Sequence, residues 1–425
     1  MPSLKLLFSL IVIAADTYLL WPFLRADSLI AIAIVLLGLR QPPPSLMRSP
    51  KQERARTQLI VSYFLFWGVV GLIDTCRGMF WNELGAYIVT FFFFTAFLYL
   101  ERLPDNYKYI KYYILFFIFF NLAFALLQMG GSDITAGSLY SLIPGIRVDR
   151  LFQGVTRQGL RISGAYAYCI GFASMLGCMF VVIFYLLRQG NRVRGYLLLA
   201  LVGVMLFFTL TRSVLIALPT AVILADLIVS KKRNSRYLLR CCAILLLSLL
   251  VWSFLEKKSE ESGSRYLEYR DGSSIQRYQV NIYGVVGTFL ESPVFGTSRD
   301  RRTAMNAILR GYNELGLILQ DYFVPAVTHH NEPAYYFRYY GFVGSIFYFL
   351  LYFSIIRYIL ICKQNSDLRK ALLGAVLYFF IYNLMHNGKL LNSFFLWILL
   401  AINMPESPAA ETAKEEPPPG GAEKK

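Results

Sequence analysis

Long apolar runs recur along the chain, and they constrain its fold more than any other feature. They alternate with short connections that are rich in lysine and arginine. Overall, 56% of the residues are hydrophobic and 16% are charged, whereas a soluble domain carries about 25% charged residues. A helix pairs all its backbone polar groups within one segment, as the inside of a bilayer requires. The sequence therefore predicts an all-α polytopic membrane protein.

The apolar runs predict about twelve transmembrane helices. The first run begins at Leu6 and resembles a signal peptide, but no cleavage site is evident and a second run follows at 28–39, so we expect a retained hairpin. The other runs lie near 59–73, 84–100, 113–129, 165–187, 196–210, 214–228, 238–255, 335–361, 371–385 and 390–402.

Four regions follow from this spacing. Residues 1–255 hold nine transmembrane helices, residues 256–334 form a large loop or domain, and residues 335–403 hold three more helices. The stretches 274–290 and 302–319 of the loop are helix-like. Residues 404–425 are rich in Pro, Ala, Glu and Lys, so we expect a disordered cytoplasmic tail.

The basic connections predict the orientation. Those near 102–111, 188–194, 231–240 and 363–370 fall on the same side as the basic loop 40–56, which the positive-inside rule places in the cytoplasm. The large loop then lies on the outer face. The net charge of +16 is largely explained by these connections, and no nucleic-acid partner is expected.

Arginine is nevertheless abundant on the predicted outer face. Its planar fork of donors matches the oxygens of phosphate, so we expect an anionic partner such as phosphate or pyrophosphate. Alternatively, these arginines pair with acidic residues of the loop or contact lipid headgroups. They are Arg147, Arg150, Arg157, Arg161, Arg265, Arg270, Arg277, Arg299, Arg301, Arg302 and Arg310.

Two of the outer arginines stand at the ends of apolar runs. Thr211-Arg212-Ser213 is all that separates two runs, and Arg161 opens the run that begins Arg161-Ile-Ser-Gly-Ala. Two permanently charged groups at the outer interface suit a lipid-linked pyrophosphate whose tail lies in the bilayer. The alternative is that they anchor helix ends by reaching towards the headgroups.

Two of the three histidines are adjacent at the boundary between the large loop and the next apolar run. Neutral imidazole accepts a proton near pH 7, and neighbouring arginines keep it neutral. His330 is the candidate general base, and the sequence leaves His329 open as the alternative. Glu332 could orient an imidazole or act as the base itself. His386 is expected to be structural.

No metal or cofactor is predicted, because DxD, HExxH and GxxxxGK motifs are absent and the six cysteines include no CxxC pair. The energy for a transfer would then come from an activated substrate. Gly341 and Gly344 are expected to permit close helix packing.

His330-Asn331, nine further residues and Gly341-x-x-Gly344 follow the H[NSQ]-x9-GxxG pattern of bacterial O-antigen ligases, which the chain resembles. The resemblance extends over most of residues 59–402. It includes the polytopic body, a large outer loop that ends at the motif, an arginine between two middle helices (Arg212) and a basic segment like Arg161-Ile-Ser-Gly.

This resemblance implies a metal-independent, inverting glycosyltransferase of the bacterial inner membrane that acts in the periplasm and needs no cofactor. Its donor would be a polysaccharide on undecaprenyl pyrophosphate, and its acceptor a terminal sugar of lipid A-core. His330 would deprotonate the acceptor, while Arg161 and Arg212 would neutralise the departing pyrophosphate. Further substrate contacts are expected from Arg147, Arg265, Arg277, His329 and Asn331.

Three alternatives remain open. An O-antigen polymerase and a protein O-oligosaccharyltransferase would share the domain and its chemistry. A lipid-linked sugar transporter is less favoured, because transporters carry ionisable groups near the membrane centre and often repeat their halves. Here the charges gather at one face and no repeat is evident.

Overall fold

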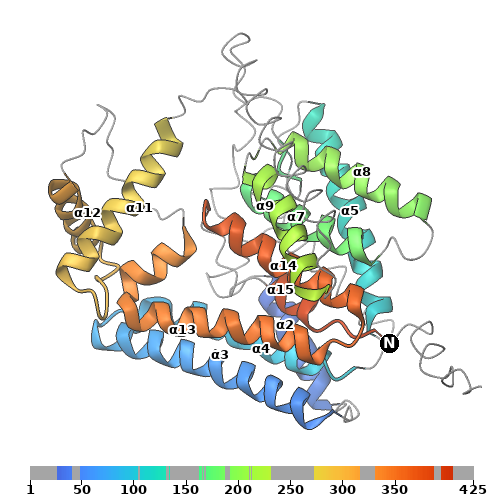
Figure 1. Ribbon diagram of the computed structural model, residues 1–425, viewed down its shortest axis with the longest axis horizontal. Helices are drawn as coiled ribbons and strands as arrows, with labels where there is room; N and C mark the ends of the chain where they lie inside the picture. Colours follow the sequence, from blue (N-terminus) through green and yellow to red (C-terminus); the bar gives the residue numbers. More distant parts are fainter. Residues whose placement is uncertain are drawn as a thin grey trace, which may run out of the picture.

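The computed structural model describes residues 26–40, 48–103, 106–130, 134, 162–164, 166, 169–186, 192–209, 211, 213–230, 272–315, 331–386 and 394–404. These residues form helices and no strand, as expected for an all-α protein. The helices are α2 (Ala26–Arg40), α3 (Pro50–Cys76), α4 (Phe80–Leu100), α5 (Tyr107–Met129), α7 (Cys169–Tyr185), α8 (Arg192–Phe208), α9 (Ser213–Val229), α11 (Gly272–Glu291), α12 (Arg301–Leu315), α13 (Glu332–Cys362), α14 (Ser366–Asn383) and α15 (Phe394–Leu400) (Figure 1).

Three of these helices, α3, α4 and α13, are long and apolar enough to cross a membrane. Shorter apolar helical segments are Ser28–Leu39, Ile114–Met129, Ile170–Tyr185 and Ser213–Val229. The chain is therefore a helical membrane protein. The number of crossings and the outer position of the large loop stay predictions, and the runs beginning at Leu6 and at 238 lie outside the described residues.

Aromatic packing joins the helices of the bundle. The helices α3 and α13 pack side by side (Figure 1), and the rings of Phe66 and Tyr336 meet edge to face at 5.2 Å between centroids. Tyr63 stacks on Phe94 of α4 at 3.8 Å. A second group forms where α14 packs against α7 and α9. Large apolar rings thus supply much of the core.

The helices α11 and α12 lie at the two helix-like stretches of the large loop, and they pack against each other as a hairpin. They approach so closely that a Cβ on Gly287 would stand 1.7 Å from the carbonyl oxygen of Ala307. A small apolar cluster of Val280, Tyr283 and Ile308 lies between them. The predicted helix at 274–290 is confirmed; α12 begins as expected, and residues 316–330 lie outside the described part.

The linker between these two helices (residues 292–300) attaches the hairpin to α13. Gly341 interrupts α13 with φ 62° and ψ −156°. The freed N–H of Phe342 donates to the carbonyl of Pro293 at 2.8 Å, and Val343 N–H donates to Val294 at 3.1 Å. The expected close approach at Gly341 therefore exists, but its partner is a non-helical linker rather than a helix.

A cluster around Glu101 closes one end of the bundle. The carboxylate is fully buried. It pairs with Arg48 at 3.2 Å and with Arg56, and it accepts a hydrogen bond from the hydroxyl of Tyr358 at 2.7 Å. We call this the Glu101 end, and the opposite end, which contains Asn331 and Ser213, the motif end.

Lys363 lies at the Glu101 end, just beyond α13, with only 3% of its surface exposed. Its ammonium donates to the carbonyl of Ile402 at 2.7 Å and to Asn403 Oδ1 at 3.2 Å. Burial disfavours the charged form and lowers the pKa of Lys363 to about 8.

Replacing Gly341 with alanine should weaken the whole attachment. The backbone angles lie in a region that is essentially restricted to glycine and costs other residues about 1–3 kcal/mol. In addition, the new Cβ would stand 2.4 Å from the carbonyl of Val294. We expect thermal unfolding in detergent to show a loss of about 2–4 kcal/mol. Gly68→Ala is the control, since nothing lies within 4 Å of its added Cβ; equal losses in both variants would contradict this account.

Lys363 should also make stability depend on pH. Its pKa is about 8 in the fold and 10.5 ordinarily, so between these values the unfolded chain binds more protons and stability rises with pH. Thermal midpoints measured from pH 7.5 to 10 should therefore rise less in Lys363→Met than in the unaltered chain. Lys51→Met, at an exposed position of α3, should keep the original slope. Identical slopes in all three proteins would show that Lys363 is not the titrating group.

Candidate functional site

Asn331 caps the start of α13 and also ties it to the end of α14. Its Oδ1 accepts from the N–H of Ala334 at 2.8 Å, which is the usual bond of an N-cap residue. Its Nδ2 donates to the carbonyl of Leu384 at 2.8 Å. Pro333 occupies the first turn, where a missing N–H costs nothing. The second residue of the histidine motif is thus a helix cap.

Glu332 is the first residue of α13 and is fully buried. Its Oε2 accepts a hydrogen bond from Nδ2 of Asn383 at 3.1 Å. A carboxylate in the first turn also interacts favourably with the helix dipole. These contacts turn Glu332 into the bundle and support a structural role, rather than the role of base that the sequence left open.

His386 connects the end of α14 with the start of α9. Its Nε2 lies 2.7 Å from the hydroxyl of Ser213, the residue that follows Arg212. Its ring packs on Tyr382 with centroids 4.6 Å apart. Asn331, which follows His330, bonds to Leu384, and Ser213, which follows Arg212, bonds to His386. These two contacts therefore lie within one turn of each other at the end of α14.

The segment after Arg161 is held between α5 and α8. Ile162 N–H donates to the carbonyl of Phe208 at 3.1 Å, at the end of α8. The buried side chain of Gln128 in α5 accepts from the N–H groups of Ser163 and Gly164 at 2.9 and 3.0 Å and donates to Gly164 O at 2.8 Å. Because α8 leads directly into α9, this segment also belongs to the motif end.

Most of the predicted site residues themselves lie outside the described part of the chain. They are Arg147, Arg161, Arg212, Arg265, His329 and His330. Arg277 belongs to α11, but the structure does not describe its side chain. Asn331 is described in full. The structure does describe the residues that directly follow Arg161, Arg212 and His330 in the sequence. These are Ile162, Ser213 and Asn331.

Arg77 is a residue of the motif end that the sequence reasoning missed. Its guanidinium donates to three carbonyls of the hairpin linker, those of Phe295, Gly296 and Thr297, at 2.8, 2.6 and 3.0 Å, and to that of Tyr339 in α13. The sequence contained an indication of this role. Arg77 lies between the predicted helices at 59–73 and 84–100, on the side opposite to the basic loop 40–56, where the positive-inside rule disfavours arginine.

Arg299 is one of the loop arginines considered as phosphate ligands, and here the alternative applies. It pairs with Glu83, donates to the hydroxyl of Tyr340, and lies over three tyrosine rings at 5.2–5.6 Å. The same hydroxyl donates to Asp74 at 3.1 Å. Arg310 likewise lies 4.0 Å from Glu291. Part of the positive charge of the hairpin therefore serves its attachment.

The described part of the motif end positions polar groups beside apolar helices. In the described ranges, no three His, Cys, Asp or Glu side chains are grouped so that they could hold a metal ion. Side-chain hydrogen bonds fix Asn331, Ser213 and the pair Ser163 and Gly164. Such fixation is what a site needs if it is to hold two reactants in a defined geometry.

The two bonds of Asn331 can be separated by mutation. Asn331→Ala removes both, and loss of an N-cap costs about 0.5–2 kcal/mol, so the thermal midpoint should fall. Asn331→Asp keeps the accepting oxygen for Ala334 but loses the donor to Leu384, so it should fall less. Asn365→Ala, which removes the cap of α14, is the comparison for loss of a cap alone. If aspartate is as harmful as alanine, the bond to Leu384 matters more than the cap.

Comparison with known proteins agrees with the motif. Residues 195–349 match the family model described as O-antigen ligase. This segment runs from α8 into α13 and includes Arg212, Arg265, Arg277 and the whole motif from His330 to Gly344, whereas Arg147 and Arg161 precede it. No protein of curated function matches the chain. Over residues 195–349, the chain is therefore similar to the O-antigen ligase family.

Proposed function

We propose that the chain is an O-antigen ligase. It transfers a polysaccharide from undecaprenyl pyrophosphate to a terminal sugar of lipid A-core, in the periplasmic leaflet of the bacterial inner membrane. The family domain supports the class of reaction. The helical membrane body supports substrates that are lipids.

The proposed reaction is an inverting displacement at the anomeric carbon of the donor. His330 takes the proton of the acceptor hydroxyl, and the acceptor oxygen bonds to the anomeric carbon. The bond from that carbon to the pyrophosphate oxygen breaks, and undecaprenyl pyrophosphate leaves with the electron pair. Arg161 and Arg212 stabilise the negative charge that develops on it. No external energy source is needed, because the donor is already activated.

One observation carries the proposal, namely the convergence at the motif end. The residue after Arg212 bonds to His386, and the residue after His330 bonds to Leu384 two positions earlier. The residue after Arg161 bonds to the end of the helix that leads to Arg212. The described residues that follow Arg161, Arg212 and His330 thus all lie at the motif end, which supports our proposal that the base and the two cations act together.

The support for the other predicted substrate contacts differs from residue to residue. Arg265 and Arg277 lie within the matched family segment, while Arg147 lies before it. Asn331 stays a proposed substrate contact, and its bonds to Ala334 and Leu384 also position the start of α13. His329 stays the alternative base, since both histidines precede the cap of α13.

The decisive experiment expresses His330→Ala and His329→Ala in a strain that lacks this protein, and examines lipopolysaccharide on gels beside a blot for membrane expression. Loss of a general base costs about 100-fold to 10,000-fold in rate, so His330→Ala should give bare core with polymer left on its carrier. His329→Ala, the matched control, should keep the ladder. A full ladder from His330→Ala would transfer the role to His329.

The deletion strain itself separates the alternatives. Loss of a ligase leaves bare core, loss of a polymerase leaves single repeats on the core, and loss of a protein glycosyltransferase leaves lipopolysaccharide intact while a protein loses its glycan. Either of the last two outcomes would replace the ligase proposal with another reaction.

A further inference from the structure

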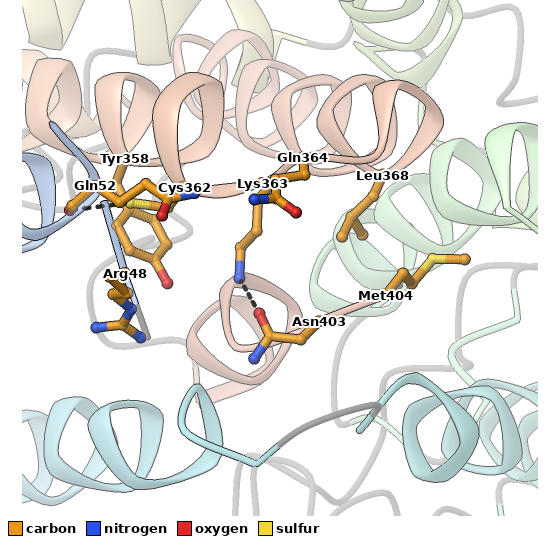
Figure 2. A pocket seen from close by; sticks show the side chains of 9 residues that line it. All are labelled: Arg48, Gln52, Tyr358, Cys362, Lys363, Gln364, Leu368, Asn403 and Met404. Carbon is orange, nitrogen blue, oxygen red and sulfur yellow. Dashed lines mark hydrogen bonds between the residues drawn. The ribbon is translucent and has the colours of Figure 1, made fainter. Parts of the chain in front are cut away.

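A cavity of about 160 Å³ lies at the Glu101 end, opposite to the motif end. Figure 2 shows Arg48, Tyr358 and Lys363 around it beneath the end of α13, with Leu368 and Met404 on its other side. The antiparallel helices α3 and α13 place Gln52 and Cys362 together here, whereas Arg77 and Tyr339 meet at their other ends. The cavity therefore takes no part in the proposed transfer reaction.

The charges around the cavity are unbalanced. Two cations, Arg48 and Lys363, are among the residues that line it, and none of the described lining residues is acidic. Behind them, the single carboxylate of Glu101 is shared by Arg48 and Arg56. Glu53 also approaches the arginines, but its side chain is 52% exposed and its attraction is screened by water.

The buried ammonium of Lys363 makes this excess of positive charge energetically unfavourable. An ammonium group has three donors, and among the described residues the two acceptors of Lys363 are neutral, the oxygens of Ile402 and Asn403. Glu101 attracts the ammonium, and the ring of Tyr358 lies 5.2 Å from it, but neither is a direct ion-pair partner. Burial of a charge without a direct partner of opposite sign is unfavourable. An anion in the cavity would supply that partner and would favour the charged lysine.

We propose that this cavity is a phosphate-binding site, occupied by the phosphodiester of a phospholipid headgroup or by free inorganic phosphate. The guanidinium of Arg48 offers planar donors that suit phosphate oxygens, and Lys363 offers a compact positive charge. The position at the end of two membrane-crossing helices, with Leu368 and Met404 in the wall, suits a headgroup with its glycerol carbons. Basic sites of this kind between helix ends bind lipid phosphates.

The test uses the purified full chain in a neutral detergent at constant ionic strength. Its thermal midpoint is measured against rising dihexanoylphosphatidylglycerol, inorganic phosphate, or dihexanoylglycerol, which lacks the phosphate. A ligand that binds the folded state raises the midpoint with concentration. We expect the phosphate-bearing lipid to raise it and dihexanoylglycerol to leave it unchanged. If inorganic phosphate alone acts, the source is the free anion; if only the lipid acts, it is the headgroup.

Matched variants locate the effect. Arg48→Gln and Lys363→Met should each raise the half-saturating concentration at least tenfold. Arg54→Gln removes the same charge from an exposed position of α3 and should behave like the unaltered chain. Arg48→Lys keeps the charge and should bind more tightly than Arg48→Gln, a comparison that decides the matter even if Lys363→Met does not fold. No shift with either phosphate ligand, or equal shifts in Arg48→Gln and Arg54→Gln, would overturn the proposal.

Discussion

The pairing of backbone groups across the break in α13 is the constraint on which the rest of the structure depends. Within lipid, a freed N–H or carbonyl must find a protein partner. At Gly341 those partners come from the linker, through Pro293 and Val294, and Thr297 returns a bond to the carbonyl of Arg338 at 2.6 Å. The break and the hairpin therefore require each other. Without the linker, α13 would carry unpaired groups, and without the break, the hairpin would have no place to attach.

The two ends of the bundle differ in how their charged side chains are paired. At the motif end, the guanidinium of Arg77 donates to backbone carbonyls, and that of Arg299 pairs with Glu83 and lies over tyrosine rings. At the Glu101 end, one buried carboxylate stands against several cations. The helices α13 and α14 extend between these ends. The same two helices thus join a region built for precise backbone geometry to a region with surplus positive charge.

The apolar periodicity predicted the helices well, because in a membrane protein the length and hydropathy of a run nearly determine its secondary structure. It also indicated the two helices of the large loop, but not that they pack as a hairpin. It could not reveal the bond between Tyr358 and Glu101 or that between Arg77 and Thr297, since each joins residues more than two hundred positions apart. For the candidate site, the motif identified Asn331 and Gly341 but not their roles. Capping and helix breaking depend on tertiary partners, here Leu384 and Val294, that no local pattern contains.

Two residues of the motif, Asn331 and Gly341, shape the backbone of α13. This changes what the motif indicates about a chain that carries it. Asn331 begins a helix and Gly341 ends its first regular stretch, so the spacing between them measures a length of helix rather than a distance between reacting groups. A chain could keep the cap and the break, build the same scaffold, and have lost the histidine in front of them. The motif is therefore in large part a signature of architecture, and only its histidine belongs to the chemistry that we propose.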